Sequence, residues 1–214
     1  MKIVLDNLAA LMKGLGVTLQ LTLGGFLMGL LIGVVIAICR VSPVRPLRIF
    51  GASYVTIMVN SPLVFLVFLA FYGVPKLGAL LSNFQCALIA VGLYLGGYIS
   101  EALRSGFNAV SNGQAEAARA IGLTFGQSLR HVIVPQALRS SVGPLSVLLN
   151  ANYRNVAVAG IIGVGEVVKV GSDLSDQTAQ QYPFFIFSFL TFMVLGFATA
   201  ALAGWLDSRV AIKR

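Results

Sequence analysis

The chain alternates between long apolar stretches and short polar ones. Four stretches contain no Asp, Glu, Lys or Arg, and they are Gly14–Cys39, Ile49–Pro75, Leu77–Ser100 and Gln177–Leu206. Each is longer than the roughly 20 apolar residues that a helix needs to cross a bilayer. A fifth stretch, Gln136–Asn155, is less clean, because only Ser140–Tyr153 within it is uncharged. The pattern predicts an all-α membrane protein with five transmembrane helices in a single domain, residues 1–214.

One polar stretch, Gly113–Pro135, interrupts this pattern. It contains Arg119, Arg130, Glu116 and the only His of the chain. Charged groups are too costly to leave in hydrocarbon. The polar stretch is therefore expected to face water or a partner protein.

Capping signals divide the polar stretch into two short helices. Ser111 with Gln114, and Thr124 with Gln127, have the spacing of a capping box. In this motif the cap side chain and the third helical residue satisfy each other's backbone donors. Gly122 is placed to end the first helix, because glycine takes a left-handed conformation at little cost.

Pro135 is expected to end the second helix, because proline lacks the N–H donor and its ring clashes with the preceding turn. The result is a helix, a sharp turn and a second helix. A plain solvated linker between two spans would normally be shorter. The Ala-rich, low-bulk faces favour a knob that inserts into a groove of another protein, and the linker is the alternative.

Composition agrees with a membrane protein that has no reaction chemistry of its own. Of the 214 residues, 57% are hydrophobic and 10% are charged, and the mean hydropathy is +0.90, beyond the range of soluble domains. The sequence has no phosphate-binding loop, no HExxH and no CxxC motif, and one His offers little material for acid–base catalysis. We predict a conduit, not an enzyme, with no catalytic residue, metal site or cofactor in this chain.

The polar stretch resembles a known motif. Glu116-Ala117-Ala118, then Gly122, then the ending Ile133-Val134-Pro135 are similar to the EAA loop of membrane permease subunits of ATP-binding cassette (ABC) importers. The wider match, GQAEAARAIGL from Gly113 onward with HVIVPQALR, resembles the polar amino acid permeases in particular. Flanking stretches extend the resemblance over most of the chain.

The resemblance implies a fold, a site and a set of partners. It implies a type I ABC importer permease fold in a bacterial cell membrane, with a cytoplasmic coupling loop at about 105–135 that docks into a cleft of the ATPase subunit. The residues expected to carry this coupling are Gly113, Glu116, Ala117, Ala118, Gly122 and Pro135. The expected partners are two ABC ATPase subunits that hold ATP and Mg²⁺, a second permease that is homologous or identical, an extracytoplasmic amino-acid-binding protein, and membrane lipid.

Charge distribution fits this orientation. If the polar stretch is cytoplasmic, five spans place the N-terminus outside and the C-terminus inside. Ten of the fifteen Lys and Arg residues then lie on the inner side, including the tail residues Arg209, Lys213 and Arg214. This agrees with the positive-inside rule. The asymmetry explains the net charge of +8 and the pI near 9.9 without any nucleic-acid partner.

The resemblance implies a polar amino acid as substrate. The segments RVSPVRPLR, EALRSG, GQAEAAR and IGVGE look closest to glutamate permeases of Gram-positive actinobacteria, which favours glutamate, with glutamine, arginine and histidine open. Two other classes are considered. An ion-gradient-driven secondary transporter would need buried acidic residues in mid-span, which the four clean stretches lack. The other is a non-transporting membrane scaffold.

Asn60 and Ser61 are candidates for the substrate pathway. They precede Pro62, which is expected to kink the second span, and they either line the pore or repair the freed backbone carbonyls. Val59 stands where the permeases it resembles have Arg. Either a partner subunit supplies that Arg or this subunit contributes less to substrate contact, which leans towards a heterodimer.

Arg154 and Asn155 form the second candidate, because they resemble the Lys-Asn position of these permeases. An ionisable residue at membrane depth usually faces a cavity or a partner, and a guanidinium can bind a carboxylate through two parallel hydrogen bonds. The alternative is that Arg154 extends to the outer interface. The following segment, Ile162–Glu166, resembles the outer gate of the family.

Further residues are expected to mediate contacts between helices. Three glycines at four-residue spacing lie in the first stretch, namely Gly25, Gly29 and Gly33. They allow another helix to approach closely, within this subunit or in a dimer. Glu101 and Arg104, one helical turn apart, are expected to form an ion pair. Polar groups in hydrocarbon need partners, and those expected to face protein for this reason are Thr18, Gln20 and Thr22.

Overall fold

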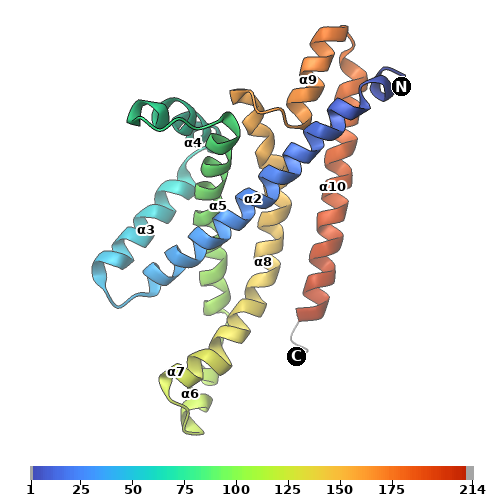
Figure 1. Ribbon diagram of the computed structural model, residues 1–214. Coiled ribbons are helices and arrows are strands. Elements are labelled where there is room, and N and C mark those ends of the chain that lie inside the picture. The colour runs from blue at the N-terminus through green and yellow to red at the C-terminus, as the bar shows by residue number, and fades with distance from the viewer. Residues whose placement is uncertain (1, 211–214) are drawn as a thin grey trace.

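A computed structural model describes residues 2–210, and within that range the chain is helical without strands (Figure 1). In chain order the elements are α1 (Lys2–Asp6), α2 (Leu8–Val41), α3 (Arg45–Asn60), α4 (Leu63–Phe68), η1 (Leu69–Gly73), η2 (Val74–Leu77), α5 (Asn83–Asn108), α6 (Asn112–Ala120), α7 (Phe125–Ser128), η3 (Leu129–Ile133), α8 (Val134–Asn155), η4 (Val156–Ile162), α9 (Val167–Thr178) and α10 (Gln181–Val210). The predicted all-α fold is confirmed. The predicted tail residues Lys213 and Arg214 lie outside the described residues.

Four helical segments of the described range are long and apolar enough to span a membrane. They are Leu8–Val41, Asn83–Asn108, Phe125–Ile162 and Gln181–Trp205. The predicted count of five is reached when Arg45–Asn60 and Leu63–Leu77 are counted as one span, although the chain bends by 105° between them.

The second predicted span is broken, not kinked. α3 ends at Asn60, Ser61 is extended with φ −91° and ψ 134°, and α4 begins after Pro62. Proline disfavours helical backbone in the residue before it and supplies no N–H donor. These two effects together end the helix where a single kinked span was predicted.

α2 crosses α5 diagonally, and their packing forms the main core (Figure 1). Gly25, Gly29 and Gly33 of α2 face Val91, Leu95 and Ile99 of α5, one glycine per turn. A Cβ added to Gly29 would lie 2.6 Å from the Leu95 Cβ atom. Because these glycines are covered by α5 of the same chain, the alternative of a dimer face is wrong for them.

Polar groups of α2 hold other elements against it. Thr18 and Thr22 are buried as predicted, whereas Gln20 is exposed, so that prediction is wrong for this residue in the single chain. The Oγ1 of Thr18 accepts a hydrogen bond from the Val167 backbone N–H of α9 at 3.1 Å. The backbone carbonyl of Thr22 accepts one from Asn152 Nδ2 of α8 at 2.8 Å.

The bundle has two distinct ends. At one end α6, α7 and η3 extend past the end of α5, and residues 109–133 are called the knob from here on (Figure 1). At the other end α9 packs beside the start of α2 and of α10, around Leu11, Leu174 and Phe184. We refer to these as the knob end and the α9 end.

The α2–α5 contact yields a stability prediction with a matched control. Gly29→Ala should lower the stability of the detergent-solubilised chain by about 1–3 kcal/mol, because the new methyl group overpacks against Leu95. Gly16 lies in the same helix with nothing within 4 Å of an added Cβ. Gly16→Ala should be neutral or stabilising, because alanine favours helix by about 1 kcal/mol over glycine. Thermal unfolding followed by circular dichroism measures both, and equal midpoints for the two variants would contradict the packing.

Candidate functional site

The turn of the knob is a complete helix-ending motif. Gly122 has φ +84°, the left-handed region that glycine favours. The backbone N–H of Leu123 donates to the Ala118 carbonyl at 3.1 Å, and that of Gly122 donates to the Arg119 carbonyl at 3.0 Å. This pair of bonds is the Schellman pattern. The prediction that Gly122 ends the first helix is confirmed.

The two predicted capping boxes have different outcomes. Thr124 and Gln127 form the reciprocal pair at the start of α7, as predicted. Ser111 caps α6 without a side-chain hydrogen bond, so that box is wrong. The amide of Gln114 is used elsewhere, because its Oε1 accepts a hydrogen bond from Gln136 Nε2 at 3.3 Å. This contact ties α6 to the start of α8.

α6 presents an exposed face of small side chains. Gly113, Glu116, Ala117 and Ala120 lie three or four residues apart and are all exposed, whereas Ala118 points inward and is 3% exposed. Residues at this spacing share one helix face. Glu116 is the one charged group on that face. A partner can therefore approach the α6 backbone closely, as the docking interpretation requires.

Pro135 does not end the second helix of the knob, which corrects the prediction. It lies in the first turn of α8, and helix continues from Phe125 to Ile162. The preceding turn, Leu129–Ile133, has the wider π geometry. A widened turn accommodates a missing N–H and the bulk of the proline ring without ending the helix. The knob and α8 are thus joined by unbroken helix.

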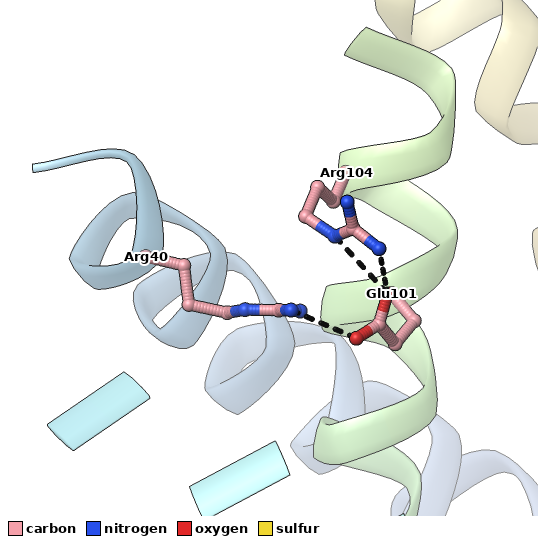
Figure 2. A network of polar contacts seen from close by, with 3 residues as sticks. All are labelled: Arg40, Glu101 and Arg104. Carbon is pink, nitrogen blue, oxygen red and sulfur yellow. Dashed lines mark hydrogen bonds and ion pairs between the residues drawn. The ribbon is translucent and has the colours of Figure 1, made fainter. Parts of the chain in front are cut away.

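An ion network joins α2 to α5 at the knob end (Figure 2). Glu101 Oε2 accepts hydrogen bonds from Arg104 Nε at 3.1 Å and from Arg104 Nη2 at 2.8 Å, as predicted. Its other oxygen, Oε1, lies 2.8 Å from Arg40 Nη2. The side chain of Arg40 is only 15% exposed. The sequence did not reveal this contact, because Arg40 is distant along the chain.

The break between α3 and α4 leaves backbone carbonyls that side chains satisfy. Asn60 Nδ2 donates to the Thr56 carbonyl and Ser61 Oγ to the Ile57 carbonyl, each at 2.7 Å. The hydroxyl of Tyr98 on α5 donates to the Val59 carbonyl at 3.2 Å. Repair of the backbone by Asn60 and Ser61 is confirmed, and their role in a pore stays a prediction.

Arg154 and Asn155 lie at the end of α8. Arg154 is exposed, and its guanidinium lies 5.7 Å from the centre of the Tyr153 ring, within reach of a cation–π contact. η4 begins directly after Asn155, and α4 packs against η4. The two candidate pathway regions are therefore brought to the same part of the bundle. Among the described residues no hydrogen bond or ion pair joins Arg154 to Asn60.

Glu166 is a buried carboxylate at the start of α9. It is 0% exposed and caps α9, accepting hydrogen bonds from the backbone N–H groups of Val168 at 3.0 Å and Lys169 at 2.7 Å. Burial raises the pKa of the Glu166 carboxyl, and the two backbone hydrogen bonds oppose that rise only in part. The sequence carried no local signal for this cap, because Glu is not among the preferred cap residues and Lys169 does not complete a capping box.

The geometry defines the class of protein. A bundle of helices long and apolar enough to span a membrane, with a two-helix knob that offers an exposed small-residue face at one end, is typical of a multi-pass membrane protein. Residues 29–212 match the family described as "Binding-protein-dependent transport system inner membrane component". The chain belongs to this family of transport permeases.

Individual relatives and one solved structure agree over nearly the whole chain. The chain is 33% identical over 218 residues to the glutamate transport system permease protein GluC of Corynebacterium glutamicum, covering 96% of each chain. It is 30% identical over 208 residues to the "Probable glutamine ABC transporter permease protein GlnM" of Bacillus subtilis, covering 97% of this chain and 96% of the relative. A crystal structure of an amino acid ABC transporter with histidines matches with a TM-score of 0.92 at 25% identity, over 96% of each chain. The predicted ABC importer permease fold is confirmed.

Glu166 gives the α9 end a pH-dependent stability. Because the folded-state pKa is raised, the contribution of this carboxyl is most favourable below its ordinary pKa of about 4.3 and is lost as the pH rises through the raised value. Glu166→Gln removes the ionisation and should flatten this part of the pH dependence. The thermal midpoints of the two proteins, compared from about pH 4 upward, test this, and parallel pH curves would contradict it.

Proposed function

We propose that this chain is the membrane-spanning subunit of an ABC importer for a polar amino acid, with glutamate as the first candidate. The observation that carries the proposal is the knob, in which a small-residue face on α6 is held by the Gly122 turn and joined to α8 by continuous helix. Two separate ABC ATPase subunits, with ATP and Mg²⁺ bound to them, supply the energy. Their closure moves the knob, which shifts the bundle between outward-open and inward-open states.

The proposed orientation places the knob in the cytoplasm. The N-terminus and the α9 end then lie outside, and the C-terminus inside, of a bacterial plasma membrane. The positive-inside distribution of Lys and Arg supports this orientation. An extracytoplasmic amino-acid-binding protein docks at the α9 end.

A second permease chain, identical or homologous, completes the pathway. One chain with four spans and one broken span has too few helices to enclose a gated route, and exposed apolar residues cover most of α10. Two permeases related by a twofold or pseudo-twofold axis supply the missing walls. Val59, at the position where related permeases are expected to have Arg, favours a homologous partner over an identical one.

The substrate route passes the α3–α4 break and the end of α8. Asn60 and Ser61 mark the broken span, and Arg154 with Asn155 supplies charge and amide groups nearby. The guanidinium of Arg154 suits a carboxylate of the amino acid. The relatives named for glutamate and glutamine transport support a polar amino acid, and the acidic ligand is favoured by Arg154.

The knob can be tested at its turn. Gly122→Val should reduce ATP-driven uptake at least tenfold while membrane insertion and ATPase assembly persist, because a β-branched residue is strained at φ +84°. Gly122→Asn should restore much of the uptake, because Asn tolerates the left-handed conformation. Gly126→Val, at an exposed helical glycine with open space around it, is the matched control.

Uptake and ATP hydrolysis are measured together in vesicles that contain the whole importer. Unchanged uptake in Gly122→Val would remove the knob from the coupling role. Uptake that persists with the ATPase inactivated would favour an ion-gradient-driven transporter, and the absence of any uptake in all variants and the parent would favour a scaffold.

Arg154 can be tested by its effect on apparent affinity. Arg154→Ala should raise the KM for glutamate uptake about tenfold or more, the effect expected when a charge-assisted hydrogen bond worth roughly 1.5–3 kcal/mol is lost. Arg154→Lys keeps the charge but loses the paired hydrogen bonds, so its KM should lie between those of the parent and of Arg154→Ala. A KM that stays at the parental value in Arg154→Ala would leave Arg154 as an interfacial anchor.

A further inference from the structure

A pocket of about 530 Å³ lies at the α9 end of the bundle. α2 turns one face of its first turns towards this pocket, with residues three or four positions apart, namely Ala10, Lys13, Gly14 and Val17. The start of α5 and the loop Gly163–Gly165, between η4 and α9, form further walls. The pocket therefore joins three parts of the chain that are distant in sequence.

The pocket lies at the outer water boundary of the proposed orientation. The uncharged stretch of α2 begins at Gly14, directly after Lys13. α2 has 34 residues, whereas about 20 are enough to cross the hydrocarbon, so the helix is long enough to extend beyond it. Ala10 and Lys13 are both exposed. A protein that docks at the α9 end can reach this pocket from water.

One cation lines the pocket. Lys13 is the charged residue among the lining side chains that the structure describes. Within residues 2–210 its side chain takes part in no hydrogen bond or ion pair. Glu166 and Asp173, the acids nearest to the loop in sequence, are already engaged, because Glu166 caps α9 and Asp173 pairs with Lys169. The ammonium group of Lys13 is thus complementary to a carboxylate from outside the chain.

The loop wall of the pocket is anchored at both ends by side chains of other helices. Asn83 Nδ2 of α5 donates to the Ile162 carbonyl at 2.7 Å, and the Val167 N–H donates to Thr18 Oγ1 of α2 at 3.1 Å. The loop follows directly on η4, which begins after Asn155. A group bound in the pocket would therefore lie against the segment that leads from the proposed substrate route to α9.

We propose that this pocket receives an acidic side chain, Asp or Glu, of the extracytoplasmic amino-acid-binding protein, with its carboxylate on Lys13 Nζ. A free small ligand is usually oriented by several converging polar groups. Here the polar side chains of the α5 wall are engaged within the chain, Ser82 with Gln85 and Asn83 with Ile162. One cation among small and apolar residues suits a carboxylate that a second protein holds in place. The inference rests on the proposed importer function and adds the residue that recognises the partner.

Docking can be measured with the whole importer in phosphatidylcholine vesicles, as the concentration of liganded binding protein that gives half-maximal ATP hydrolysis. Lys13→Gln should raise this concentration about threefold, the size expected for an exposed ion pair. Lys13→Glu should raise it further, because two carboxylates repel each other. Lys13→Arg keeps the charge and should remain close to the parent. Added salt should weaken docking more in the parent than in Lys13→Gln, because salt screens exposed charges.

Lys76→Gln is the matched control. Lys76 is exposed in η2, before the start of α5, and does not line the pocket. Its replacement removes the same charge from the same side of the membrane in the proposed orientation. The half-maximal concentration should therefore stay at the parental value.

Carbodiimide cross-linking tests the contact itself. The reagent joins a lysine amine to a touching carboxylate as an amide, so mass spectrometry should find Lys13 linked to an Asp or Glu of the binding protein. Lys13→Arg should abolish this link while docking persists, because the reagent does not couple a guanidinium. Replacing the linked acid of the binding protein by Lys should restore docking to Lys13→Glu.

Three results would overturn the pocket as the docking site. In the first, Lys13→Gln docks as the parent does and Lys13 forms no link. In the second, Lys76→Gln loses as much as Lys13→Gln, which shows a general attraction by charge. In the third, the effect of Lys13 appears only when phosphatidylglycerol is added, which assigns Lys13 to a lipid head group. The parent is still stimulated in each case, so the transport proposal stands. A parent that no amino-acid-binding protein stimulates would contradict the proposed function, and this inference with it.

Discussion

The close packing of α2 against α5 forms the centre of the bundle, against which α3, α8 and α9 are placed. Gly25, Gly29 and Gly33 let the two helices approach at the distance of direct contact. α2 then uses polar groups along its length to fix its other neighbours. Thr18 holds the start of α9, the Thr22 carbonyl holds Asn152 of α8, and Arg40 holds Glu101 of α5. Thr18 and Thr22 are buried, so their polar groups depend on these protein partners in place of water.

The sequence was sufficient for features that depend on local chemistry. Gly122 and the Thr124 box were predictable, because a left-handed glycine and a reciprocal cap involve residues within one turn of each other. The extent of apolar residues likewise located the spanning segments, although the stretch Ile49–Pro75 is broken and not one helix. The sequence could not show which helix covers Gly25, Gly29 and Gly33, because small side chains pack equally well inside a subunit or between subunits.

The errors arose where distant residues compete with a local signal. The Gln114 side chain accepts a hydrogen bond from Gln136 and does not bond the backbone at the start of its own helix. The two Gln side chains meet only when α6 lies against the start of α8. The break at Pro62 is stable because Tyr98, far along the chain, satisfies the Val59 carbonyl. Within the candidate site the Gly122 turn was predictable, whereas the passage of the helix through Pro135 was not. The Arg40 contact and the role of Glu166 were not, since each depends on burial that no local pattern shows.

The uninterrupted helix through Pro135 changes how a force on the knob would reach the rest of the bundle. A helix ending at Pro135 would have left a hinge there, and movement of the knob could be absorbed in the loop. Instead the helix from Phe125 to Asn155 extends for roughly 45 Å at about 1.5 Å per residue. α8 is held against α5 at Gly106, where an added Cβ would lie 2.6 Å from the Ala137 carbonyl oxygen. We therefore expect displacement at the knob to tilt α8 about this contact, and the far end of that tilt is the segment that carries Arg154 and leads into η4.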